Sequence, residues 1–146
     1  MSNNNSVLRL DASQNNQLKS LHVIADNLEE ILLPAGDTDD FIDFILLNSK
    51  VNEVDLTPFV ELQELQIENN MLVNLDLSSN IDLRNVDCSG NPLTSLNLAN
   101  GNNAQIVTMD ATDASLTCIQ IDQGFQPPAD DSWQIDPGAV YSDNCQ

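Results

Sequence analysis

The chain contains very little positive charge. It has 4 Lys and Arg residues against 23 Asp and Glu residues among 146, which gives a formal net charge of −19 at pH 7. Proteins that bind a phosphate backbone or an anionic membrane surface need clustered Lys and Arg side chains. Four scattered basic residues cannot form such a cluster, so we expect no nucleic-acid partner. The negative charge instead favours solubility and the attraction of cations or basic proteins.

The chain also lacks long apolar runs and is poor in aromatic residues. No stretch of about 18 consecutive apolar residues occurs, so we predict no membrane insertion. The opening residues MSNNNSVLRL have neither the charged nor the apolar region of a signal peptide. Aromatic residues make up 4% of the chain, and His22 is its one histidine. The length fits one domain, and an apolar content of 41% is sufficient for a core.

A periodic apolar pattern runs through most of the chain. The template L-x-x-L-x-L recurs at steps of mostly 10 or 11 residues, and all 33 positions of its three columns hold an apolar residue or Cys. The middle column consists of Leu10, Leu21, Ile31, Phe44, Val54, Leu65, Leu75, Val86, Leu96, Met109 and Ile119. We call these residues the anchors. A fixed period of this kind indicates a solenoid whose unit is about 21 residues in two halves.

Each half-repeat predicts one short strand. The x-L-x-L segment alternates with period 2, and turn-forming residues follow it. Neither half is long enough for an ordinary helix. We therefore predict a mostly β solenoid of about five to six coils, with two short parallel strands per coil. Residues 1–6 are predicted to be disordered, residues 7–121 to form the solenoid, and residues 122–146 to form an irregular cap.

The stretch LVNLDLSSNIDLRNVDCSGNPLTSLNLANGNN resembles the 21-residue class of leucine-rich repeats, sometimes called IRREKO repeats. It is most similar to the repeats of secreted or surface-exposed bacterial proteins, and LTCIQID, W-x-x-D and YSDNC resemble their Cys-containing C-terminal cap. The resemblance covers residues 7–145 and is clean from Val51 onward. It implies a right-handed leucine-rich-repeat solenoid and a secreted or cell-surface location. It also implies a recognition function in which exposed positions choose the ligand.

The three cysteines divide into a predicted pair and a single thiol. A disulfide between Cys118 and Cys145 would fasten the cap over the last coil. Closing a loop of about 27 residues contributes roughly 3–4 kcal/mol on chain-entropy grounds, and such a bond indicates an oxidising compartment. Cys88 falls in an inward column, so we predict a buried structural thiol rather than a nucleophile. No two Cys or His residues have the spacing of zinc ligands.

Asparagine recurs five residues after several anchors, at Asn70, Asn80 and Asn91. A buried amide can donate to and accept from the backbone of neighbouring coils. We predict a structural ladder of these three residues. Phe59 and Gly101 are among the residues that interrupt the column, so the ladder is expected only in the middle of the chain.

Outward aspartates are predicted to stack between coils. The repeat places Asp55 above Asp76 on one sheet and Asp87 above Asp110 on the other, with parallel strands about 4.8 Å apart. Like charges in register are mildly destabilising. We consider two interpretations, a solvated face kept for solubility and a rim that binds a cationic or sugar ligand.

A second acidic cluster lies in GDTDDFID, residues 36–43. Its candidate calcium ligands are Asp37, Asp39 and Asp40, but the D-x-D-x-D-G pattern of a strong calcium loop is absent. A hydrated loop is the simpler interpretation. We therefore expect no cofactor, with weak Ca²⁺ binding as the alternative.

The segment FIDFILLN, residues 41–48, is apolar on both faces. The predicted outward patch comprises Ile24, Ile42, Ile45 and Leu47. Contiguous exposed apolar patches usually mark a contact surface. The contact could be a partner, the PAGDTDD insertion, or a domain outside this chain.

The chain offers no convergent acid, base and nucleophile, so we predict that it is not an enzyme. The leading hypothesis is an extracellular binding or adhesion module that presents an acidic sheet and one apolar patch to a protein or glycan. The alternative is a structural spacer or surface-layer domain that carries other domains. In either case we expect the chain to belong to a longer chain or a complex.

Overall fold

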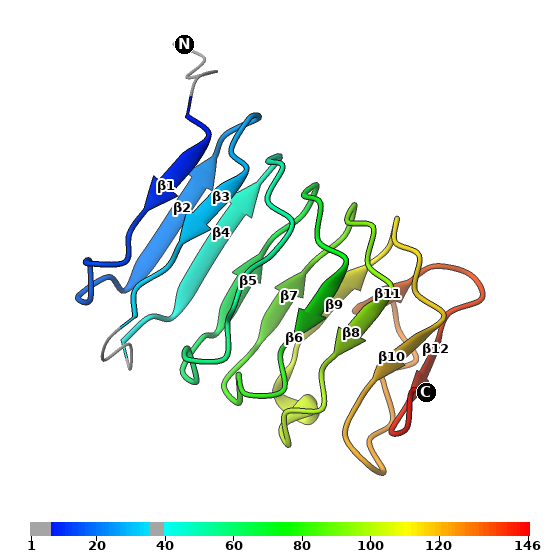
Figure 1. Ribbon diagram of the computed structural model, residues 1–146. Coiled ribbons are helices and arrows are strands. Elements are labelled where there is room, and N and C mark those ends of the chain that lie inside the picture. The colour runs from blue at the N-terminus through cyan, green and yellow to red at the C-terminus, as the bar shows by residue number, and fades with distance from the viewer. Residues whose placement is uncertain (1–6, 36–39) are drawn as a thin grey trace.

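The computed structural model describes residues 7–35 and 40–146, and these form a solenoid of short parallel strands (Figure 1). The prediction for residues 1–6 lies outside this range. The strands are β1 (Arg9–Asp11), β2 (Ser20–Ile24), β3 (Glu30–Leu32), β4 (Asp43–Leu47), β5 (Glu64–Gln66), β6 (Asn74–Asp76), β7 (Asn85–Asp87), β8 (Ser95–Asn97), β9 (Thr108–Ala111), β10 (Cys118–Gln120), β11 (Trp133–Ile135) and β12 (Val140–Ser142). One 3-10 helix, η1 (Asn103–Gln105), precedes β9.

The strands form two sides of the solenoid. One side is a six-stranded sheet in the order β11-β9-β7-β5-β4-β2. The other side, which we call the divided sheet, consists of β1-β3 and, separately, β12-β10-β8-β6. Every pairing is parallel and joins anchors of successive coils, such as Leu65 with Val86 and Leu75 with Leu96. The predicted two strands per coil and the mostly β class are therefore confirmed for most coils.

The divided sheet lacks the strand predicted around Val54. Residues 53–55 belong to no strand, and Val54 is only partly buried. A continuous sheet would place Glu53 beside Glu30, because both residues directly precede an anchor. Like charges directly opposite each other weaken pairing but do not by themselves prevent it, since Asp43 pairs with Glu64 between β4 and β5.

The inward columns fill the core as the repeat predicts. Buried Leu, Ile, Val and Phe side chains run from Leu28 to Ile121 as one cluster. Phe59 interrupts the asparagine column and packs against Phe41 with ring centroids 4.7 Å apart. An aromatic ring therefore fills the space that the amide occupies in later coils.

The asparagine ladder forms and extends further than predicted. Asn91 Nδ2 donates to Ile67 O at 2.8 Å, a bond between successive coils. Beyond the expected end of the ladder, Asn100 Nδ2 donates to Asn80 O at 2.8 Å. Asn103, also buried, donates to Leu98 O at 2.6 Å. The sequence pattern missed Asn103 because the two-residue insertion moves it to seven residues after the anchor Leu96, and it missed Asn100 because that residue stands four residues after the anchor.

Residues 122–146 are more regular than the predicted irregular cap. β11 extends the six-stranded sheet, with Trp133 beside Met109, and β12 extends the divided sheet, with Tyr141 beside Ile119. Trp133 is buried and its ring lies 5.8 Å from that of Tyr141. The segment is therefore a last coil that closes the core with aromatic residues.

The cysteines take the predicted positions. Cys118 and Cys145 form a disulfide with a Cα–Cα distance of 5.7 Å. Cys88 is fully buried as a free thiol. Burial, together with the nearby Asp87 and Asp110 carboxylates, raises the pKa of the Cys88 thiol, so that it stays protonated. A protonated, inaccessible thiol is a packing group and not a nucleophile.

Candidate partner-binding surface

The outer surface of the six-stranded sheet, which we call the sheet face, gathers most of the predicted site residues. Strand residues alternate between the core and this surface. The outward residues are Ser20, His22, Ile24, Asp43, Ile45, Leu47, Glu64, Gln66, Asn85, Asp87, Thr108, Asp110 and Gln134. No Lys or Arg belongs to the six strands. The sheet face thus has an apolar end at β2 and β4 and an acidic, polar end from β5 to β11.

Hydrogen bonds between strands hold the polar end in place. Glu64 accepts from Asn85 Nδ2 at 2.8 Å and from Gln66 Nε2 at 3.0 Å. Thr108 Oγ1 donates to Asn85 Oδ1 at 2.9 Å. These side chains therefore form a preorganised row across β5, β7 and β9.

A shallow depression of about 320 Å³ lies over β5, β7, β9 and the start of β11. Its acidic lining residues are Glu64, Asp87, Asp110 and Asp131. Asp87 and Asp110 stand side by side in the parallel register, as the spacing predicts. The depression therefore concentrates negative charge on one area of the sheet face.

Each of these two stacked aspartates also closes a turn of its own coil. Asp87 Oδ1 accepts from the Ser89 N–H at 3.0 Å and from its Oγ at 2.6 Å. Asp110 Oδ1 accepts from the Thr112 N–H at 2.9 Å and from its Oγ1 at 2.6 Å. The residues thus have a structural role that the sequence signals through D-x-S and D-x-T, which the repeat template ignored.

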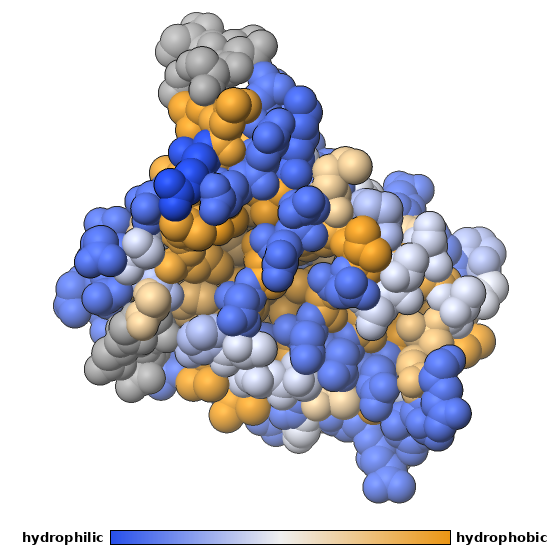
Figure 2. Space-filling model, viewed as in Figure 1, coloured by the Kyte–Doolittle hydropathy of each residue, from blue (hydrophilic) through white to orange (hydrophobic). Residues whose placement is uncertain are grey.

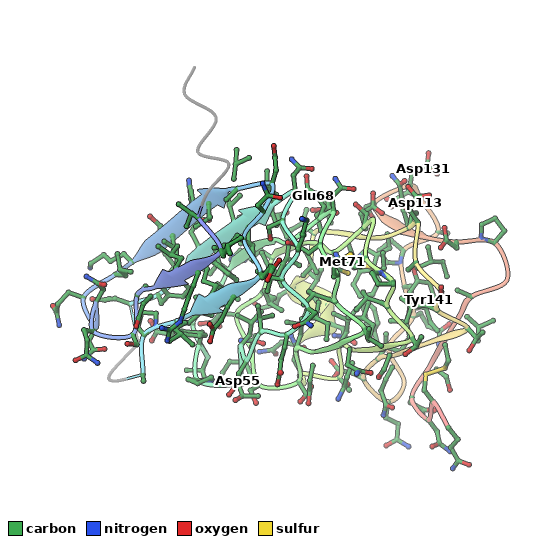
Figure 3. All side chains as sticks on the ribbon, turned by 45° about the horizontal axis from the view of Figure 1, so that its top comes forward. Asp55, Glu68, Met71, Asp113, Asp131 and Tyr141 are labelled. Atoms are coloured by element: carbon green, nitrogen blue, oxygen red, sulfur yellow. A yellow bond between two sulfur atoms is a disulfide. The ribbon has the colours of Figure 1, made fainter. Side chains whose placement is uncertain are left out.

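The other two predicted aspartates lie on the far side of the solenoid. Figure 3 shows Asp55 on the opposite side of the solenoid from Glu68 and Asp131. The predicted stacking of Asp55 on Asp76 is wrong, because residues 53–55 lie outside the sheets and Asp76 pairs with Asn97. Two hydrogen bonds from Thr57 lower the pKa of Asp55, so it too is a turn-closing residue.

Glu68 joins the acidic group, although the sequence pattern did not single it out. It stands three residues after the anchor Leu65, where the template places no requirement. Its Oε2 is buried without a hydrogen-bond partner among the described residues. Burial raises the pKa of Glu68, and the charges of Asp87 and Asp110 raise it further. A negative charge on Glu68 is therefore energetically unfavourable in the free protein.

The apolar end is smaller than predicted. Ile24 is 70% exposed and Ile42 is 40% exposed, whereas Ile45 and Leu47 are half-buried. Ile45 and Leu47 lie on the outward side of β4, as predicted, but they are only partly exposed because β2 and β5 flank β4 on both sides. Ile24 and Leu47 are nevertheless neighbours in the register, so an apolar contact surface remains.

The candidate calcium loop is only partly described. Asp37 and Asp39 lie outside the described residues, and Asp40 forms an ion pair with Lys19 at 3.1 Å. Within the described ranges no group of three or more His, Cys, Asp or Glu residues has an arrangement that could hold a metal ion. The calcium hypothesis therefore stays a prediction about residues 36–39.

Comparisons with known proteins agree with the fold. No protein-family model matches the chain, and no curated protein matches it. Among solved structures it is similar to the functional domain of InlJ from Listeria monocytogenes, which includes a cysteine ladder. That match has a TM-score of 0.50 and 22% sequence identity, and covers 90% of this chain and 31% of that one. The fold is that of a leucine-rich-repeat-like solenoid.

The described part of the chain contains no helix with the length and hydrophobicity needed to cross a bilayer.

Proposed function

We propose that the chain is an extracellular, non-enzymatic module of adhesion type that binds a basic protein surface with its sheet face. The observation that carries this proposal is the composition of that surface, which is acidic over β5 to β11 and contains no Lys or Arg in its six strands. Complementary charge steers association and fixes the orientation of a partner. The adjacent Ile24 and Leu47 add apolar contact area, as in the cores of protein interfaces.

Two further features support the individual parts of this proposal. The disulfide between Cys118 and Cys145 fits an oxidising, extracellular compartment. A non-enzymatic role fits the buried thiol of Cys88. It also fits the position of His22, which does not line the acidic depression and whose Nε2 lies 2.8 Å from Asp43 Oδ2. A protein-type binding role is also in keeping with a leucine-rich-repeat-like solenoid.

A protein partner is favoured over a glycan because the sheet face has no aromatic platform. Sugar rings are commonly held by stacking on exposed aromatic side chains. Phe41, Phe44, Phe59 and Trp133 are buried, and the remaining two aromatics, Phe125 and Tyr141, pack against the core.

The test compares two variants that change the net charge equally. Asp87→Asn with Asp110→Asn removes two charges from the sheet face, and Asp11→Asn with Asp76→Asn removes two from strands β1 and β6 of the divided sheet. Asparagine keeps the turn, because Asn97 accepts the Ala99 N–H at 3.0 Å in the equivalent position.

With cytochrome c as a basic probe in calorimetry at low salt, the sheet-face variant should bind about fivefold more weakly and the control within about twofold of the wild type. Equal weakening in both variants would show only non-specific attraction to the net charge, and would refute the sheet face as the site.

The spacer hypothesis is favoured by the N-terminal end of the solenoid. Among residues 7–35 and 40–146, β1 and β2 each have one unpaired edge, and a depression of about 280 Å³ opens there between Val7, Leu10, Val23 and Leu28. Such an end fits against another coil or domain. End-to-end association in light scattering, lost in Ile24→Gln, would favour the spacer. A monomer at all concentrations would argue against it.

A further inference from the structure

The interruption of the divided sheet creates a groove on the side away from the sheet face. It lies between residues 29–35, which include β3, and residues 52–59, and has a volume of about 600 Å³. Figure 2 shows a hollow in the viewed surface, with hydrophobic atoms at its floor and hydrophilic residues around it. The hollow coincides with the gap between β3 and β6 in Figure 1. The groove is thus the place where the strand predicted at Val54 is missing.

One wall of the groove is an open strand edge. β3 pairs with β1 through the backbone of Glu30 and Leu32, with N···O distances of 3.1 and 2.8 Å. Alternate residues of a strand direct their N–H and C=O groups to opposite edges, so Ile31 and Leu33 direct theirs toward the groove. Among the described residues, no backbone hydrogen bond joins β3 to residues 53–55. An unpaired edge of this kind is a template for another strand.

The rim of the groove carries uncompensated negative charge. Glu29, Glu53 and Asp55 are exposed, and none of them belongs to an ion pair within the described chain. Glu30 is paired with Arg9 at 2.9 Å. Repulsion across the groove opposes its closure by this chain's own backbone. A ligand that brings cations between the two walls would remove that repulsion.

We propose that this groove binds an extended, basic peptide segment of a partner protein, which adds as a strand along the free edge of β3. Strand addition takes its affinity from main-chain hydrogen bonds and its specificity from alternate side chains. Lys or Arg at alternate positions meets Glu29 and Glu53, while the intervening apolar residues face Leu33 and Val54. This site is independent of the sheet face, and either one can fail without the other.

The probe is a capped seven-residue peptide of alternating Lys and Val, titrated into the full chain by calorimetry and NMR. Two further versions of the peptide carry N-methyl groups on alternate backbone nitrogens, one version on the odd-numbered residues and the other on the even-numbered residues. They keep charge and side chains but remove the N–H donors from one edge of the peptide.

One of the two N-methylated versions should bind at least about tenfold more weakly than the parent peptide. Glu29→Gln with Glu53→Gln should weaken binding about fivefold, whereas Asp87→Asn with Asp110→Asn, which removes the same charge elsewhere, stays within about twofold. The amides of Ile31 and Leu33 should gain protection from hydrogen exchange when the peptide is bound.

Three results would overturn the proposal. The first is equal binding of both N-methylated peptides and the parent. The second is a loss of affinity in the sheet-face variant that matches or exceeds the loss in the groove variant, because the peptide would then bind the other side. The third is a dimer in light scattering that disappears with the peptide, which would assign the groove to a second copy of the chain.

Discussion

Replacement of Asn91 by alanine should destabilise the fold by about 4 kcal/mol. Its Oδ1 accepts the Leu72 N–H at 3.1 Å, and its Nδ2 donates to Cys88 O at 3.0 Å and to Ile67 O at 2.8 Å. Ile67 O keeps a second donor, Asn70 Nδ2 at 2.9 Å. The Leu72 N–H and Cys88 O lose the partner they have in Asn91. Each unsatisfied buried group costs about 1–3 kcal/mol.

The matched comparison is Asn80→Ala, which should cost about half as much. Asn80 Nδ2 donates to Leu56 O and Phe59 O, both at 2.8 Å. Leu56 O also accepts from the Phe59 N–H, and Phe59 O from the Leu62 N–H. No backbone group is orphaned, and the substitution removes an Asn80 Oδ1 that is buried without a partner. The loss is therefore only that of two ordinary hydrogen bonds and the void, about 2 kcal/mol.

Urea unfolding followed by circular dichroism measures both losses, with the exposed Asn74→Ala as a control that should stay within about 0.5 kcal/mol. The two buried variants remove the same atoms, so their voids are comparable and the difference isolates the unsatisfied backbone groups. If the two variants lose the same free energy of unfolding within about 0.5 kcal/mol, or if Asn80→Ala loses more, the extra cost assigned to the unsatisfied backbone groups at Asn91 is refuted.

Four further results are expected. Cys118→Ser with Cys145→Ser should lower the free energy of unfolding by roughly 3–4 kcal/mol, and a loss below about 1 kcal/mol would show that the last coil holds without the bond. Glu68→Gln should raise Tm at neutral pH, since the pKa of Glu68 is higher in the fold than in the unfolded chain. That gain should vanish below about pH 4.5, where the carboxyl is protonated in both states, and a pH-independent gain would contradict it. Cys88 should resist iodoacetamide at pH 8 until the chain unfolds, whereas rapid labelling of the folded protein would contradict its burial. EDTA should leave Tm unchanged, and a fall reversed by Ca²⁺ would assign a metal site to the insertion between β3 and β4.

The sequence predicts most of the fold because the inward columns depend on each half-repeat alone. A Leu at an anchor with a coil on either side is buried, as at Leu65, Leu75 and Leu96, so the core, the parallel pairing and the inert position of Cys88 follow from period 2. The failure at Val54 has a different origin. Its local pattern is normal, and the contacts between coils that decide whether residues 53–55 pair, such as Glu53 beside Glu30, are not contained in a single-coil template.

The repeat template did not predict the last coil, because the spacing of its anchors differs from that of the earlier coils. Trp133 and Tyr141 take anchor positions, but the steps from Ile119 to Trp133 and from Trp133 to Tyr141 are 14 and 8 residues, outside the 10 to 13 of the repeat. Large rings fill the core there in place of several Leu side chains, so the chain can leave the strict period and still close the sheets. Asn103 escaped the pattern in the same way, because an insertion shifts its number without changing its role.

The acidic excess of this chain is tolerated where the backbone neutralises it. Asp87 and Asp110 stand in register, yet both form regular strands, because each carboxylate accepts N–H and hydroxyl donors from its own turn. Glu53, in the stretch that forms no strand, has no ion pair among the described residues. Glu68 has no hydrogen-bond donor for its buried oxygen among those residues, and there burial and charge raise the pKa. The groove and Glu68, whose charge is coupled to Asp87 and Asp110, are thus two places where the repeat leaves negative charge unsatisfied. Binding of a cationic partner would relieve an existing repulsion at either place, and this makes both better candidates for recognition than the many satisfied aspartates between them.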